Sequence, residues 1–328
     1  MADPTAPLWM LSSSPHAHEG SSVRRIMIDV LIALLPAFAV AVAVFGLDAI
    51  RLVTVCVASC LLAEFGARKL MGRNAGIDDF SAAVTGVLLA FNLPPALPTW
   101  MAVLGSVFAI VVVKQLFGGI GYNIFNPALC ARVFLLISFP VAMTTWAPWD
   151  AVTTATPLGA WKTAWAAGAA PAHFAATYPL GSLFLGNQLG SLGEVSELAL
   201  LLGGLYLLAR RVIYWEIPVF YLATVAGFAA ILYAIDPVTN LSPLYHLATG
   251  GLFLGAFFMA TDMVTSPVTR VGQMVYGVGL GLLTLVIRRW GGYPEGVSFA
   301  ILILNAFSPL IDKFIQPRTF GHAKKKPA

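Results

Sequence analysis

Long apolar stretches separated by short connections follow one another along nearly the whole chain. Hydrophobic residues make up 59% of the 328 residues and charged residues only 10%, too few to cover the surface of a soluble protein. A helix crosses the hydrocarbon core of a bilayer with about 20 apolar residues. The sequence therefore predicts an all-α polytopic membrane protein with about ten transmembrane helices. The expected spans are roughly 26–45, 51–65, 80–91, 100–116, 124–140, 195–209, 212–235, 247–263, 271–287 and 297–315.

Two of these spans are expected to be interrupted. The third is short and runs into Asn92-Leu-Pro-Pro95, and the eighth ends in Thr261-Asp262. Irregular backbone at membrane depth is tolerated only where it is buried in protein or lines a cavity. We therefore expect each of these two segments to be a broken or half-depth helix.

The chain also repeats itself in outline. Thr85-Gly86, a proline-containing break, a span and a glycine-rich turn recur as Thr249-Gly250, a second such break, a span and a second such turn. This predicts two five-helix repeats, residues 26–140 and 195–316, and the odd number of spans per repeat makes the second one inverted. Inverted repeats with broken helices place their ligand site between the halves. Transporters share this architecture with electron carriers, so it leaves the function open.

The basic residues predict the orientation in the membrane. With the N-terminus inside, fourteen of the nineteen Lys and Arg residues fall on the inner side, among them Lys114. Four fall outside, among them Lys162, and Arg132 lies within a span. Basic residues collect on the cytoplasmic side in short connections. We therefore expect a cytoplasmic segment at 1–25, an external loop at 141–194 and a basic cytoplasmic tail at 317–328. The net charge of +4 reflects this topology, and nothing indicates nucleic-acid binding.

The expected external loop carries the most informative short motif. Asp150-Ala-Val-Thr-Thr-Ala-Thr156 is followed by Pro157, and it resembles the sequence at which bacterial flavin transferases esterify the phosphate of FMN to a threonine hydroxyl. Thr156 would then carry a covalent redox cofactor. The alternative is an ordinary turn, because a residue before proline is held in extended conformations and small polar residues populate turns. Taken alone, the heptapeptide favours the turn.

Polar side chains at membrane depth mark a second candidate site. Arg132 follows Asn123 by nine residues, about 14 Å along a helix, which places it near the middle of the bilayer. Asp262 ends the eighth span on the same half of the membrane as Asn123 and Asn126. An intramembrane arginine needs a partner and indicates a functional site. The alternative is structural: an Arg132–Asp262 pair, or helix capping by the asparagines and the aspartate.

Ser191 and Glu194 have the spacing of a capping box. Together they precede an apolar run, so we expect them to open the sixth span. A helix N-terminus of this kind is also able to bind a flavin phosphate, an interpretation that we favour less.

Metal and haem sites are disfavoured. Cys56, Cys60 and Cys130 form no CxxC pair and lack a fourth ligand, so an iron–sulfur cluster or zinc site is not expected, and we interpret them as small buried hydrophobes. The five histidines fall outside the spans or at their edges, so paired intramembrane haem ligands are absent. These are His16, His18, His173, His246 and His322.

Five motifs in order carry a family resemblance. The chain resembles the family of membrane subunits that contains RnfD of the Rnf electron-transport complex and the related NqrB of the sodium-pumping NADH:quinone reductase. The short segment before the first span favours the RnfD branch, and Thr154 is a departure because the family commonly has glycine there. The motifs are Ser14-Pro-His16, residues 114–128 with Asn123 and Asn126, Asp150 to Thr156, Gly190 to Glu194, and Ala260-Thr-Asp262.

The resemblance implies a flavoprotein subunit that relays single electrons. It implies FMN joined by a phosphoester to Thr156 on the outer face, and a non-covalent flavin, riboflavin, bound on the inner side by Asn123, Asn126 and Asp262. Arg132 is our own addition to the inner site, as a charge that stabilises the reduced flavin. The implied location is the bacterial inner membrane.

The resemblance also implies the partners. They are the other membrane and peripheral subunits of the Rnf complex, with their flavin and iron–sulfur centres. That complex couples oxidoreduction between ferredoxin and NAD to transport of protons or sodium, and the chain would be its electron-transfer subunit without being an enzyme alone. The rival interpretations are a secondary transporter or channel of the same architecture, or a scaffold subunit without a cofactor.

Overall fold

All of the described secondary structure is helical. The computed structural model describes residues 22–73, 78–146, 156–166, 178–185, 190–237, 239–293 and 295–316. The all-α prediction is confirmed for these residues. Five of their helices are long and apolar enough to cross a membrane, as expected of a polytopic membrane protein. They are α1 (Val23–Phe45), α2 (Leu47–Leu70), α11 (Glu216–Ile235), α14 (Arg270–Trp290) and α15 (Val297–Phe314).

Shorter helices occupy the positions of the other expected spans. Four of these positions hold α3 (Ser81–Phe91), α4 (Thr99–Val107) with its π-helical continuation η1 (Phe108–Gln115), α5 (Pro127–Ser138) and α10 (Glu197–Ala209). The eighth position is divided among α12 (Pro243–Leu247), α13 (Leu252–Leu254) and η4 (Gly255–Met259). Most of these pieces are well short of the roughly 20 residues of a full crossing. The count of ten spans therefore stays a prediction.

The expected external loop is partly a folded cap. It contains α7 (Pro157–Ala166), α9 (Leu180–Leu185) and η3 (Leu192–Glu194), while α6 (Pro140–Thr144) leads into it. Leu158 and Trp161 of α7 are buried in one cluster with Leu183 of α9 and Tyr245 of α12. This apolar cluster explains why helices form where the sequence indicated only a polar connection.

The eighth span breaks at two adjacent glycines, earlier than the sequence indicated. Gly250 and Gly251 have φ of 76° and 61°, in the left-handed region that favours glycine. A Cβ on Gly250 would lie 2.8 Å from Nη2 of Arg288, and one on Gly251 would lie 2.9 Å from Oε1 of Glu194. The turn therefore needs glycine for its conformation and for space. This turn brings the side chains of Arg288 and Glu194 close to the start of α13.

Packing relations within the first half of the chain recur in the second half. α2 packs against α3 and α4, as α11 packs against α12 and α14, and α4 packs against α5 as α14 packs against α15. Across the two halves, α1 packs against α10 and α5 against α15. This pattern agrees with the repeat that the sequence indicates. The inverted orientation of the second copy stays a prediction.

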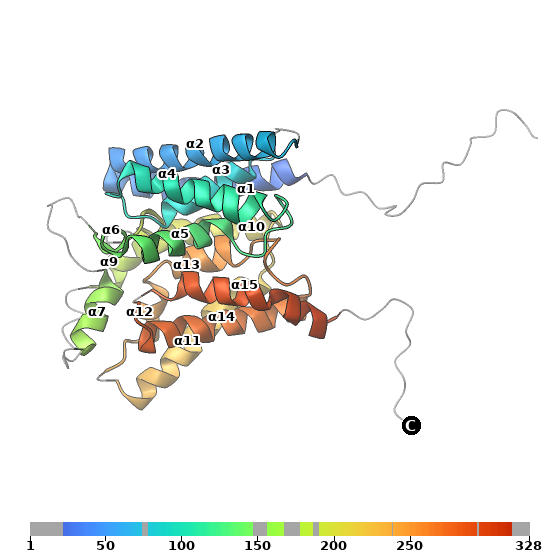
Figure 1. The fold of residues 1–328 in the computed structure, drawn as a ribbon. Coiled ribbons are helices and arrows are strands. Elements are labelled where there is room, and N and C mark those ends of the chain that lie inside the picture. Colours follow the sequence, from blue (N-terminus) through green and yellow to red (C-terminus); the bar gives the residue numbers. More distant parts are fainter. Residues whose placement is uncertain are drawn as a thin grey trace, which may run out of the picture.

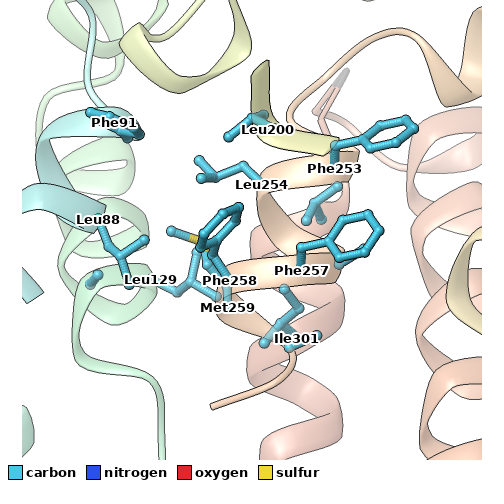
Figure 2. Packing of buried hydrophobic residues seen from close by; sticks show 14 of the residues in the cluster. Leu88, Phe91, Leu129, Leu200, Phe253, Leu254, Phe257, Phe258, Met259 and Ile301 are labelled. Atoms are coloured by element: carbon cyan, nitrogen blue, oxygen red, sulfur yellow. The ribbon is translucent and has the colours of Figure 1, made fainter. Parts of the chain in front are cut away.

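The contact between the halves is apolar. Figure 2 shows Leu88 and Leu129, from α3 and α5, on one side, and Leu254, Phe258 and Met259, from α13 and η4, on the other. All five side chains are buried. Between helices in lipid, close packing of this kind takes the place of the hydrophobic driving force that acts in water.

The helices expose large apolar side chains around the outside of the molecule. Leu35 of α1 is 57% exposed, Leu62 of α2 is 71% exposed and Ile231 of α11 is 59% exposed. Exposed apolar side chains on long apolar helices are expected where a protein contacts lipid or another protein. Polar side chains of the same helices are buried in the interior of the protein, as expected when lipid surrounds the helices.

The two ends of the molecule differ in what they carry. α1 begins and α15 ends at one end, on the right in Figure 1, whereas α7 and α9 lie at the opposite end, on the left. We call these the N/C end and the α7 end. Because the first 21 residues and residues 317–328 lie outside the described part of the chain, nothing follows for the predicted N-terminal segment and basic tail.

Candidate functional site

Two cavities, one at each end of the molecule, contain the candidate residues. The cavity at the N/C end, of about 120 Å³, is lined by Asn123, Asn126 and Asp262. The cavity at the α7 end, of about 240 Å³, is lined by Thr156 and Arg132. The structure therefore divides the predicted set into two sites and places Arg132 with Thr156, away from the asparagines.

Thr156 caps the helix that follows it. Pro157 begins α7, the Thr156 hydroxyl oxygen accepts a hydrogen bond from Gly159 N at 3.2 Å, and its carbonyl oxygen accepts one from Ala160 N at 2.8 Å. An oxygen of this kind satisfies one of the free N–H groups at a helix start. The turn that the sequence offered as an alternative is therefore present. The other residues of the motif, Asp150 to Ala155, lie outside the described residues.

A lysine joins α7 to the second half of the chain. Lys162 Nζ donates hydrogen bonds to the carbonyl oxygens of Arg288 at 3.2 Å, of Tyr293 at 2.9 Å and of Gly291. Hydrogen bonds from a charged donor contribute about 1.5–3 kcal/mol when buried, and this lysine is partly exposed. The sequence indicated Lys162 as an external basic residue without predicting this role. Its bonds hold Thr156 beside the loop between α14 and α15.

Arg132 pairs with the start of the last helix. From α5 its guanidinium donates to the Glu295 carboxylate and to the Ser298 hydroxyl. The predicted alternative, a pair with Asp262, is not formed. Arg132 Nε is buried and has no hydrogen-bond partner among the described residues. The pair joins the two halves across the α7-end cavity.

Asn126 has a structural role that the sequence offered as an alternative. It is the N-cap of α5, and its Oδ1 accepts from Ala128 N at 3.1 Å and from Leu129 N at 3.3 Å. Its Nδ2 donates to the carbonyl oxygen of Met259 at 3.4 Å. The side chain therefore caps one half and contacts the other. Its two side-chain atoms are engaged within the protein.

Asp262 closes the turn after η4, while Asn123 keeps an acceptor free. The Asp262 carboxylate accepts from Val264 N and from Thr265 Oγ1, each at 3.3 Å. Asn123 donates from Nδ2 to the carbonyl oxygen of Phe125 at 3.1 Å, and its Oδ1 accepts no hydrogen bond from the described residues. A carboxylate has lone pairs to spare after two such bonds. Asp262 and Asn123 therefore retain acceptor capacity beside the N/C-end cavity.

A buried ion pair that the sequence did not reveal borders this cavity. Lys114 lines it, and its Nζ donates to both carboxylate oxygens of Glu64, at 3.0 and 2.9 Å, and to the Ser81 hydroxyl at 2.6 Å. Glu64 also accepts from Gln115 Nε2 at 2.9 Å. The sequence indicated Lys114 only as an inner basic residue. A glutamate inside an apolar stretch is the signal that could have found the pair, because such a charge needs a partner.

The connection before α3 is also ordered by charge. Asp79 accepts from Ser81 N at 3.0 Å, from Ser81 Oγ at 2.8 Å and from Arg68 Nη2 at 3.1 Å. Partial burial acts to raise the pKa of Asp79, but these hydrogen bonds, first those from Ser81, hold it below its ordinary value. The ionised carboxylate therefore fixes the start of α3, whose residues line the N/C-end cavity.

Two further predictions have clear outcomes. The capping-box prediction is wrong, because α10 begins at Glu197 and is capped by Ser196, whose hydroxyl oxygen accepts from Ala199 N at 3.3 Å. Cys56 and Cys60 are buried and free, as expected, whereas Cys130 is free but only partly buried, so that part of the prediction is wrong. Among the described residues no group of three or more His, Cys, Asp or Glu side chains is placed to hold a metal ion.

Known proteins resemble this chain over nearly all of its length. A sequence profile described as the NQR2, RnfD, RnfE family matches residues 10–321. The D component of the Na(+)-translocating ferredoxin:NAD(+) oxidoreductase complex of Acetobacterium woodii is 49% identical over 319 residues, covering 96% of each chain. The D component of the ion-translocating oxidoreductase complex of Stutzerimonas stutzeri is 46% identical, covering 94% of this chain and 95% of its own.

A third relative differs in the ion of its name. The D component of the proton-translocating ferredoxin:NAD(+) oxidoreductase complex of Clostridium ljungdahlii is 43% identical over 319 residues, again covering 96% of each chain. The profile and the relatives agree with the branch that the ordered motifs indicate. This chain therefore belongs to the NQR2, RnfD, RnfE family.

Proposed function

We propose that this chain is the flavin-carrying, electron-relaying RnfD component of an ion-translocating ferredoxin:NAD oxidoreductase complex. Three relatives that match it end to end are named as the D component of ion-translocating oxidoreductase complexes. The observation that carries the flavin role is the position of the Thr156 hydroxyl on a cavity between the two halves of the chain. Flavins pass electrons singly, and the protein supplies their placement and electrostatics.

The α7-end cavity fits covalent FMN joined through Thr156. The Thr156 hydroxyl would carry the phosphate, and the Arg132–Glu295 ion pair would border the flavin. Tyr293 and Phe299 line the same cavity, with ring centroids 5.2 Å apart, and offer an aromatic surface. At about 240 Å³ the cavity is smaller than the 300–1,000 Å³ typical of ligand pockets. Part of the cofactor would therefore project beyond it.

The N/C-end cavity fits a smaller, non-covalent contact with riboflavin. Asn123 Oδ1 and the Asp262 carboxylate offer acceptors to the N–H and hydroxyl groups of this flavin, whereas Asn126 acts through α5 and Met259 to hold the two halves in register. The space of about 120 Å³ admits part of a ring system. In this assignment Arg132 belongs to the α7-end cavity, whereas the sequence predicted it at the inner flavin site.

The same proposal includes the topology. We propose ten spans in two inverted repeats, with the N/C end in the cytoplasm of a bacterial inner membrane and the α7 end outside. Arg25, Arg68, Arg210 and Arg211 lie at the N/C end, in agreement with the positive-inside rule. Covalent attachment also suits an outer site, because a free cofactor would be lost there by diffusion.

Substitution of Thr156 tests the covalent site. Thr156→Ala should abolish flavin fluorescence of the denatured chain in a gel, because no hydroxyl remains to carry the phosphoester. Thr163→Ala is the matched control, since Thr163 lines the same cavity but its hydroxyl donates to its own helix, to Gly159 O at 3.1 Å and Ala160 O at 3.0 Å. Fluorescence retained in Thr156→Ala, or flavin mapped by peptide mass to Thr153 or Thr154, would refute the assignment. A fluorescent wild-type band would exclude the transporter and scaffold interpretations.

A further inference from the structure

A group of charged side chains is buried beside the α7-end cavity, which two of its members, Arg132 and Glu295, line. Arg132 pairs with Glu295, and Arg288 is wholly buried and donates to the carbonyl oxygens of His246 at 2.6 Å and of Thr249 at 2.9 Å. Glu194 and Glu197 complete the group, and both are buried. The group thus holds two guanidiniums and three carboxyl groups. If all were ionised, one carboxylate would lack a counter-charge.

Glu197 is the carboxyl group without a partner. It is the first residue of α10, its side chain is 0% exposed, and neither carboxylate oxygen has a hydrogen-bond partner among the described residues. Two charged groups act on it, Glu194 of η3 and Arg288 of α14. The nitrogens Nη1 and Nη2 of Arg288 bond to carbonyl oxygens, and no ion pair with Glu197 is formed within 4 Å.

The other helices around Glu197 supply no counter-charge. α1 packs along α10, but its charged residues lie at the far end, where Arg24 and Arg25 are exposed and Asp29 accepts from Tyr206 at 2.9 Å and from Arg210 at 3.3 Å. α9, α13 and η4 also pack against α10, and their sequences contain no charged residue. Glu197 is therefore surrounded by apolar side chains. Its charged neighbours are Glu194, which has the same charge, and Arg288, which is hydrogen-bonded to carbonyl oxygens.

A comparison of free-energy costs indicates that the buried Glu197 carboxyl group is protonated. Protonating an ordinary glutamate at pH 7 is disfavoured about 500-fold. Its place in the first helical turn favours the carboxylate by only about a further 2- to 5-fold. Burying a carboxylate without a partner is disfavoured about 10⁴-fold or more. The cost of the buried charge exceeds the other two together.

Glu194 is the better placed of the two neighbours to stay ionised. Its Oε1 lies against Gly251 at the start of α13, where free N–H groups point, and Arg132 attracts it. Glu197 has no such contact. A bound metal ion in place of the proton has no support among the described side chains, which form no metal-ligating group of three.

We propose that Glu197 binds a proton at neutral pH and is a proton-exchanging site in the interior of the protein. Transfer of the proton to a water molecule leaves a carboxylate and a hydronium ion, and return of the proton restores the acid, so the step needs no reactant besides water. The assignment does not rest on the flavin proposal.

The test is the pH dependence of thermal stability of the purified chain, compared with Glu197→Gln. A glutamine has the shape of the protonated side chain and never ionises. A carboxyl that holds its proton more tightly when folded stabilises the fold fully at acidic pH and loses that contribution as pH rises. The unfolding midpoint of Glu197→Gln should therefore equal that of wild type near pH 4.5 and should be higher than that of wild type at pH 7. The ratio of the two folding equilibrium constants should grow by up to about tenfold for each pH unit.

Glu216→Gln is the matched control. Glu216 is likewise the first residue of its helix, is 1% exposed and has one oxygen without a partner, but it pairs with Arg270 Nε at 3.6 Å. Its glutamine variant should be less stable than wild type at pH 7. A Glu197→Gln variant that behaves like this control, or that fails to fold, would show that Glu197 is ionised and would overturn the proposal. Loss of an infrared band of a protonated carboxyl in Glu197→Gln would support it independently.

Discussion

At the scale of single residues, one ion pair connects the two halves of the chain. Arg132 comes from α5 of the first half, and Glu295 precedes α15 of the second. Their side chains are 9% and 12% exposed, so each charge depends on the other. Removing one partner of a buried pair leaves an uncompensated charge, whereas replacing both by apolar residues is often neutral.

Arg132→Met should therefore destabilise the fold by about 3 kcal/mol, the lower end of the range for buried pairs, because Glu295 keeps some solvent. The double variant Arg132→Met/Glu295→Met should recover most of the loss. Unfolding midpoints of both single variants and the double variant form a double-mutant cycle. Additive effects, with no recovery in the double variant, would show that the pair does not hold the halves together.

The sequence predicted that Arg132 needs a partner but offered the wrong one, Asp262 instead of Glu295. Position along a helix gives only the depth of a side chain in the membrane. The choice depends on which half α5 packs against at that depth, which is tertiary information. Thr156 shows the same limit, since the sequence predicted only a turn before Pro157 and the family resemblance implied the flavin, while the helix α7 and the cavity beside Thr156 are visible only in the fold.

At the scale of elements, hydrophobic length predicted where helices lie but not how they end. Each expected span coincides with a helix or with pieces of one. The eighth span was placed correctly, yet its break at Gly250 depends on space taken by Arg288 of a later helix. The capping box failed for a local reason, because Ser191 and Ser196 both precede the apolar run and only Ser196 caps α10.

The ends of α2 and α7 give a test of orientation. Lys69, in the last turn of α2, and Thr163, on α7, are exposed at opposite ends of the molecule. In a background without the three native cysteines, Thr163→Cys should react with a membrane-impermeant thiol reagent in intact cells. Lys69→Cys should react only after the membrane is opened. The reverse pattern would invert the proposed topology.

At the scale of the whole molecule, the candidate residues line two cavities at opposite ends, each formed where the two halves meet. Thr156 and Arg132 belong to one, and Asn123 and Asp262 to the other. The proposed electron relay would hold one cofactor near each surface of the membrane. Relatives of similar identity are named for sodium and for protons, so family membership does not set the ion.

The central claim is that this chain carries one flavin of each kind, and acid precipitation of the purified chain tests it most directly. FMN should stay in the protein pellet, and riboflavin should appear in the supernatant in a similar amount. Asp262→Leu should lower only the supernatant flavin, whereas Thr265→Val, which removes a hydrogen bond to Asp262 but keeps the carboxylate, should lower it less. A pellet without flavin, or a supernatant without riboflavin, would contradict the account.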